Sequence, residues 1–361
     1  MNTHRIDKII TAISAISIVD PGDYRGSPGS PFVGSKGDFP SNKVKMQPFV
    51  DKTGNVQEVP FLPGQSLRGA MRTTAAEIVM KRLKERGQAA KGRELYYCLM
   101  AGAASSQPDG IPPTLSESVF AAKNPFVGSY GGGPRLVWGR LLIGHAMPIT
   151  TETVAVGIVP EAYAMEAAVT KRPLTDIMWG VKKDPLKINR GVLPIIIENP
   201  EEVAAAWLAE LAVAKKKRED EMAKKKAAQE TGEKPEEDSK KKDISTVFGM
   251  NVILPGVKFH ARDYLDTTLA GDKMLGLYAL TLAAFANEQR LGGGAAKGNG
   301  RFVITATCTT DANETFPVIE AVDGKYAPAA VPQIQAAVAS WDEYAQSVTI
   351  EDFEKAFSLR S

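Results

Sequence analysis

The chain has 361 residues, of which 43% are hydrophobic and 24% are charged, and its formal net charge is +2. These values are typical of a soluble protein with a sizeable core. They exclude a polycation that attracts nucleic acid through its overall charge, so any nucleic-acid site must come from a local concentration of basic side chains.

Cysteine and histidine are too few and too dispersed for a disulfide framework or a zinc site. The cysteines are Cys98 and Cys308, and the three histidines are scattered. We therefore expect no metal and no cofactor. No basic and apolar leader with a cleavage site begins the sequence, and its longest apolar stretch, residues 274–286, is too short to cross a bilayer. A cytoplasmic location with no membrane partner is expected.

The N-terminal part of the chain predicts a strand, a long loop and a helix. Residues 11–18 alternate apolar and polar side chains, the period of a half-buried strand. Residues 20–60 are rich in Gly, Pro and Ser and predict an irregular loop insertion, which at this length tends to be functional. Ser66 is expected to be the N-cap of a helix. Arg68 and Arg72, four residues apart, share one face of it.

The middle of the chain predicts two strands, at residues 136–143 and 153–159, and then a basic segment. Residues 166–194 show no dominant amphipathic period and are interpreted as an exposed thumb-like hairpin. Its candidate ligand-binding side chains are Lys171, Arg172, Met178, Trp179, Lys182, Lys183, Lys187 and Arg190. The two large apolar side chains among them suit either stacking on bases or packing on an adjacent subunit, and the sequence does not separate these alternatives.

A low-complexity segment at residues 195–243 interrupts the fold. Residues 199–243 contain 11 basic and 12 acidic side chains, so the charge is nearly balanced. The composition indicates a solvated helix or a disordered insertion, not a nucleic-acid patch.

The C-terminal part resumes regular structure and ends in a C-terminal extension, residues 311–361. The expected elements are strands at 247–254 and 258–265, an apolar helix at 273–290, a glycine-rich loop at 292–300, a strand at 301–307, a helix at 332–344 and a short terminal helix.

The glycine-rich loop is the most informative motif. Glycines allow backbone amides to crowd around an anion, and Lys297 and Arg301 add cations. The alternative is a helix C-cap at Gly292 followed by a tight turn, but the remaining glycines exceed that need. A Walker-type loop is excluded because Lys297 is followed by Gly298 and the loop precedes a strand.

With the insertions removed, the element order is strand, helix, strand, strand, helix, strand. This order predicts an α+β fold with a ferredoxin-like (RRM-like) palm made of residues 1–19, 61–165 and 244–310. The palm's antiparallel sheet has one face under two helices, and its other face is free for a ligand, as in single-strand RNA binders.

Three segments resemble motifs of the RAMP superfamily, whose members build CRISPR effector complexes. They are FLPGQSLRGAMR at residues 61–72, NPFVGS with GGGPRL at 124–136, and LGGGAAKGNGR at 291–301. The chain length and the insertion before residue 244 are most similar to the backbone subunit of type IV complexes.

The resemblance implies a non-catalytic subunit whose copies stack head to tail along one crRNA as a helical filament, while the thumb at residues 166–194 folds over the RNA. Its partners would be the crRNA, the target nucleic acid through the guide, further copies of itself and other effector subunits. The motif-matched residues for contact with the RNA backbone are Ser66, Arg68, Arg72, Gly293, Gly294, Lys297 and Arg301.

Two other functions stay open from the sequence. In type III relatives an aspartate near the first strand cleaves target RNA, which makes Asp20, Asp23 and Asp38 candidates, although aspartates beside Gly and Pro are common in turns. A small-molecule enzyme whose glycine loop holds a phosphate is the third hypothesis, but no nucleophile–base pair or metal cluster supports it. For Arg68 and Arg72, the alternative to RNA contact is a solvated helix face.

Overall fold

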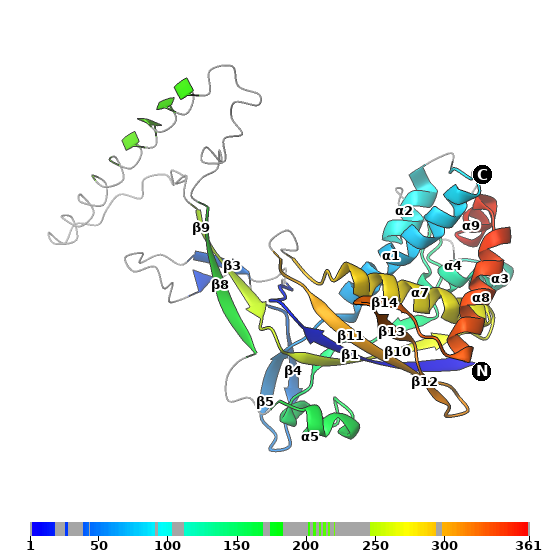
Figure 1. The fold of residues 1–361 in the computed structure, drawn as a ribbon, viewed down its shortest axis with the longest axis horizontal. Coiled ribbons are helices and arrows are strands. Elements are labelled where there is room, and N and C mark those ends of the chain that lie inside the picture. The colour runs from blue at the N-terminus through cyan, green and yellow to red at the C-terminus, as the bar shows by residue number, and fades with distance from the viewer. Residues whose placement is uncertain are drawn as a thin grey trace. The chain divides into compact units, whose positions relative to one another are not determined.

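The computed structural model describes residues 2–18, 26–27, 39–42, 44–90, 93–102, 112–168, 174–182, 246–293 and 298–359, with scattered positions between 201 and 220. The chain divides into two compact units (Figure 1). The first comprises Met1–Asp23, Asn42–Asp176 and Asn251–Ser361, and the second comprises Tyr24–Ser41 and Ile177–Met250.

The first unit is built on one antiparallel sheet with the strand order β12-β11-β1-β10-β6. The central strand β1 (Thr3–Ala12) pairs with β10 (Lys258–Asp266) and with β11 (Phe302–Thr309). The short strands β6 (Leu141–Ile143) and β7 (Met147–Pro148) pair with β10, and β12 (Thr315–Pro317) pairs with β11. The predicted α+β class with antiparallel pairing is confirmed.

One face of this sheet is buried because alternate residues of each strand are apolar. Ile6 and Ile10 of β1 and Phe259 of β10 are fully buried on this face. The helices α1 (Gly64–Glu85), α7 (Asp272–Glu288) and α8 (Pro332–Ser347) pack over it, with α7 contacting both others (Figure 1). The hairpin of β13 (Ile319–Val322) and β14 (Lys325–Pro328) also contacts α7.

Shorter helices complete the core of this unit: α2 (Arg93–Ala101), α3 (Leu115–Lys123), α4 (Pro125–Tyr130) and α9 (Ile350–Ala356). Every residue of α4 is buried, and the Asn124 side chain caps it by accepting hydrogen bonds from the Phe126 and Val127 amides, each at 3.0 Å. Among the described residues, no helix combines the length and apolar character needed to cross a membrane.

A second, smaller core covers part of the opposite sheet face. The hairpin of β4 (Met46–Val50) and β5 (Val56–Pro60), the helix α5 (Thr151–Ala155) and the 3-10 helix η1 (Glu161–Glu166) contribute to it. Its buried residues are Phe61, Met147, Ile149 and Val159, and Ile9 of β1 packs against them.

The second unit is built on a four-stranded sheet with the order β2-β3-β9-β8. These strands are β2 (Gly26–Ser27), β3 (Phe39–Asn42), β9 (Thr246–Ile253) and β8 (Thr175–Lys182). The described neighbour of β8 is β9, which follows the charged segment. The hairpin expected within residues 166–194 lies partly outside the described residues and stays a prediction. The described positions from 201 to 220 are helical and exposed.

Several element predictions were wrong or displaced. The first strand is residues 3–12 instead of 11–18. Beyond the end of this strand, Ile16 and Ser17 make isolated bridges. Residues 153–159 are not a strand, since α5 occupies 151–155. The strand predicted at 136–143 is limited to Leu141–Ile143. Residues 20–60 are not irregular throughout, because they contain the β4–β5 hairpin. The strands near 247–254, 258–265 and 301–307 and the helices near 273–290 and 332–344 are confirmed.

Candidate nucleic-acid interface

The N-terminus of α1 carries three of the residues predicted to contact RNA. The helix begins at Gly64 with Pro63 as its N-cap and no side-chain cap hydrogen bond, so the prediction that Ser66 is the N-cap was wrong. Ser66 is the third helical residue and is exposed. The first amide, that of Gly64, donates to Nδ1 of His145 at 2.9 Å and is therefore already used within the protein.

Arg72 is buried, with only 7% of its surface exposed, and its guanidinium donates to four backbone carbonyl oxygens. These belong to Leu99 and Tyr130, at 2.9 and 3.0 Å, and to Cys98 and Gly131. Burial, followed by the neighbouring charge of Arg68, lowers the pKa of Arg72 to about 10. Arg72 is thus positioned to hold the helix α1 against α2 and the end of α4, and its predicted contact with RNA stays untested.

Arg68 lies one turn earlier and is only partly buried. One Nη donates to the Tyr130 carbonyl at 2.7 Å, and its Nε is buried without a hydrogen-bond partner among the described residues. The first two sequence motifs, at residues 61–72 and 124–136, are therefore in direct contact. Arg68 and Arg72 of the first motif donate hydrogen bonds to backbone carbonyls of the second.

The ends of the glycine-rich loop are held against residues 13–17. The Gly293 amide donates to the Ser17 carbonyl at 2.8 Å, and the Gly300 amide donates to that of Ala15 at 2.8 Å. A Cβ on Gly292, whose φ is +73°, would lie 2.1 Å from the Ser17 oxygen, so close backbone packing requires this glycine. The C-cap of α7 is Gln289 in the left-handed conformation, not Gly292.

The first turns of α1 and the start of the glycine-rich loop border a cavity of about 300 Å³. Ser66 lines it from α1, and Gly292 and Gly293 line it from the start of the loop. Arg290, an exposed residue directly before the loop, also lines it, and the lining contains no carboxylate among the residues that the structure describes. The cavity therefore joins predicted residues from two distant motifs with one cation that the sequence analysis did not select.

Arg301 lies at the other end of the loop and is exposed. Its amide donates to the Ser14 hydroxyl at 2.9 Å, and its Nε donates to the Gln289 side chain at 3.3 Å. The backbone of Arg301 is thus held in place while its charged side chain remains at the surface. Gly294 and Lys297 lie outside the described residues.

A second, larger groove of about 770 Å³ lies along the same first turns of α1. Gln65 and Arg68 line it from the helix, Trp138 lines it from the segment that leads into β6, and Leu142 lines it from β6 itself. The first turns of α1 therefore border both hollows, with Ser66 at the smaller and Arg68 at the larger.

The predicted thumb residues are only partly described. Met178 is 43% exposed on β8. Trp179 and Lys182 belong to β8, but their side chains are not described. The basic residues Lys171, Arg172, Lys183, Lys187 and Arg190, and the candidate catalytic residues Asp20, Asp23 and Asp38, lie outside the described part of the chain. RNA contact and cleavage by these residues stay predictions.

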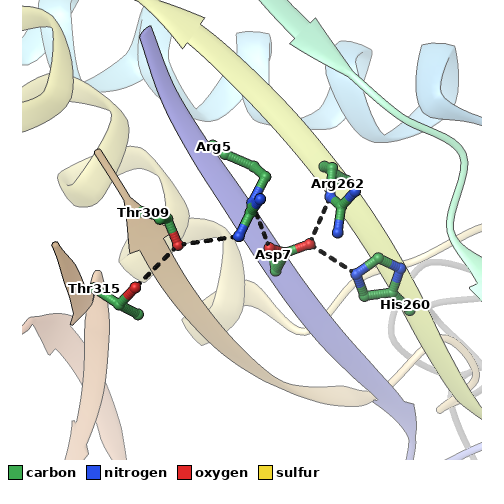
Figure 2. A network of polar contacts seen from close by, with 6 residues as sticks. All are labelled: Arg5, Asp7, His260, Arg262, Thr309 and Thr315. Carbon is green, nitrogen blue, oxygen red and sulfur yellow. Dashed lines mark hydrogen bonds and ion pairs between the residues drawn. The ribbon is translucent and has the colours of Figure 1, made fainter. Parts of the chain in front are cut away.

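The sheet face opposite the helices carries a polar network (Figure 2). The Asp7 carboxylate accepts hydrogen bonds from Arg262 Nε at 2.8 Å and Arg5 Nε at 3.1 Å, and its Oδ1 lies 2.9 Å from His260 Nε2. Arg5 also donates to the Thr309 hydroxyl at 3.4 Å. The network therefore links β10, β1 and β11.

The network makes a testable contribution to acid stability. Burial alone would raise the pKa of Asp7, but hydrogen bonds and charges from His260 and Arg262 outweigh it and lower the pKa from 3.8 to about 2. The stabilisation is thus fully present above about pH 4 and is lost as the pH falls toward 2. We expect Asp7→Asn to destabilise the protein by about 2 kcal/mol more at pH 5 than at pH 2.

Urea unfolding at both pH values measures this difference, and Asp323→Asn, at an exposed turn, is the matched control. An Asp7→Asn effect of equal size at both pH values would show that the charge of Asp7 does not stabilise the fold.

The described residues contain no group of three or more His, Cys, Asp or Glu side chains able to hold a metal ion.

No protein-family model matches the chain, and no curated protein does. A chain of a solved structure titled "Type IV-B CRISPR Complex" is similar over 84% of this chain and 90% of its own length, with 16% sequence identity and a TM-score of 0.46. Similarity of this size establishes neither a common fold nor a common function.

Proposed function

We propose that the protein is a non-catalytic backbone subunit of a type IV CRISPR ribonucleoprotein. It binds the guide crRNA through phosphate contacts that are independent of sequence, and copies of it assemble along that RNA as a filament beside other effector subunits. The bases of the guide remain free to pair with a target nucleic acid, which carries the sequence specificity.

The observation that carries this proposal is the cavity between α1 and the glycine-rich loop. Ser66 and Gly293 come from two sequence motifs that are more than two hundred residues apart, and together with Arg290, which directly precedes the second of them, they line one hollow. A hydroxyl and an exposed arginine that line one hollow suit a phosphate. Arg301, at the other end of the loop, adds a second exposed cation.

The sheet topology supports a ferredoxin-like palm. Strands β1, β6, β10 and β11 appear in the spatial order β11-β1-β10-β6, and α1 and α7 connect β1 to β6 and β10 to β11. This is the arrangement expected of a split βαβ unit. It brings the α1 motif and the glycine-rich loop to the same region, since the loop leads directly into β11.

Removal of both exposed cations tests the proposal. We expect Arg290→Ala/Arg301→Ala to weaken binding of a fluorescent single-stranded RNA by about tenfold or more and to reduce the slope of log affinity against log salt by about 1.4, the value for two lost phosphate contacts. Fluorescence anisotropy of the full-length chain at several salt concentrations measures both quantities.

Lys81→Ala/Lys325→Ala, which removes two exposed charges from α1 and β14 outside the cavity, is the matched control. The proposal predicts little change for this variant. Equal RNA affinity and equal salt dependence in the wild type and in the Arg290/Arg301 variant would contradict a phosphate site at this cavity.

A further inference from the structure

Trp138 is the most exposed aromatic side chain on the described surface, with 88% of its surface exposed. Large aromatic side chains are rarely left in water without a partner. Trp138 lines the 770 Å³ groove beside α1 together with Leu136 and Leu142, which are 58% and 64% exposed. The groove thus has an apolar wall that is fully accessible in the isolated chain.

The backbone around Trp138 is tightly held, so its exposure does not result from a loose loop. The amides of Gly132 and Val137 donate to each other's carbonyls at 2.8 and 3.0 Å. On the other side of Trp138, the Arg140 amide donates to the Gly128 carbonyl at 2.7 Å. Rigid backbone on both sides presents the indole without the entropy cost of ordering a mobile segment.

Close backbone packing reinforces this geometry. A Cβ on Gly139 would lie 2.4 Å from the Ser129 carbonyl oxygen and 2.8 Å from Arg68 Nη2. Leu136 adopts a positive φ of 52°, which is rare for a leucine and costs energy. The backbone is therefore locally strained at Leu136, which lines the groove.

The cations of the groove suit a ligand that carries hydrogen-bond acceptors. The lining includes Arg68 and Arg72 and, among the described residues, no carboxylate. Arg72 already donates hydrogen bonds to backbone carbonyls. The Nε of Arg68, in contrast, is buried without a hydrogen-bond partner among the described residues. An unpaired buried donor is costly, so a ligand that supplies an acceptor there would relieve this cost.

We propose that this groove holds an unpaired nucleobase of single-stranded RNA, stacked on Trp138 and accepting a hydrogen bond from Arg68. Every base presents a π-face and at least one ring or carbonyl acceptor, so the contact requires no particular sequence. The inference rests on the proposed function, since the adjacent first turn of α1 would hold the phosphates of the same strand on its Ser66 side. It adds a base-binding subsite to that phosphate site.

Anisotropy with two RNAs of equal length, one normal and one with abasic positions, tests the proposal on the full-length chain. We expect the wild type to bind the normal RNA about tenfold more tightly than the abasic one. Trp138→Ala should reduce that ratio substantially, and Trp138→Phe should largely preserve it. Leu115→Ala, which removes another highly exposed apolar side chain, is the control.

The same experiment separates this inference from the proposed function. If Arg290→Ala/Arg301→Ala weakens both RNAs while the normal-to-abasic ratio is the same in the wild type and in Trp138→Ala, the phosphate site stands and the base subsite is overturned. If Trp138→Ala changes only the oligomeric mass in light scattering and leaves RNA affinity intact, the groove binds protein and the proposal is again overturned. If the wild type binds neither RNA, the proposed function fails first.

Discussion

Asp263→Ala is expected to lower the free energy of unfolding by about 3–5 kcal/mol. Asp263 is fully buried under the sheet, and its Oδ2 accepts hydrogen bonds from Lys8 Nζ at 2.5 Å and from the Tyr278 hydroxyl at 2.7 Å. Lys8 is itself only 1% exposed. Loss of the carboxylate would leave an ammonium without its counter-charge in the core, and urea unfolding at neutral pH measures the cost.

The paired variant Lys8→Met/Asp263→Leu is the control for this prediction. Because it removes both charges together, it should be much less destabilised than either single change, as expected for replacement of a buried ion pair by apolar side chains. Single and double variants with additive effects would contradict the coupling of Lys8 and Asp263.

Arg72→Met is expected to lower the free energy of unfolding by about 3 kcal/mol or more, because the change leaves several buried carbonyl oxygens without their charged donor. The variant keeps the apolar stem but removes the guanidinium, which also lies over the Phe126 ring at 5.4 Å. Arg72→Lys should still be destabilised, because one ammonium does not reproduce the geometry of a planar guanidinium. Urea unfolding measures both variants.

Lys81→Met, on an exposed face of the same helix, is the matched control and should change stability by less than about 0.5 kcal/mol. If Arg72→Met unfolds at the wild-type urea concentration, Arg72 does not carry the structural role assigned to it.

The elements of the first unit that sequence patterns predicted are those with strong local periodicity. The apolar run of α7 and the alternation of β10 and β11 determine helix and strand without help from distant residues. Their spatial order follows from the order of elements, so the antiparallel sheet was also predictable.

Other elements depend on capping and tertiary contacts that composition does not reveal. Residues 153–159 contain β-branched and small residues typical of a strand, yet the Thr150 hydroxyl accepts a hydrogen bond from the Thr153 amide at 3.2 Å and starts α5. Likewise, β8 pairs with β9 across the whole charged segment. Local sequence contains no signal for a partner so far along the chain.

At the candidate site, the motifs named candidate residues but did not determine the role of each one. The first turns of α1 and the start of the glycine-rich loop line one cavity, a proximity that the motifs did not predict. The motifs also did not separate Arg72, which is buried, from Arg290, which is exposed beside the loop. Arg290 was detectable from its position directly before Leu291 in the third motif. No sequence pattern distinguished Trp138, because the exposure of its ring depends on the backbone packing around Gly139.

The most direct measurement of RNA binding by stacked copies is the length of RNA that the protein protects. The full-length chain, co-expressed with a CRISPR transcript, would be treated with ribonuclease, and the protected fragments would be sequenced. Our account predicts a ladder of guide-derived fragments whose lengths increase by a constant step, with no base preference at the step positions, because each added copy covers the same length of backbone. Absence of protected RNA, or a single fragment defined by its sequence, would contradict it.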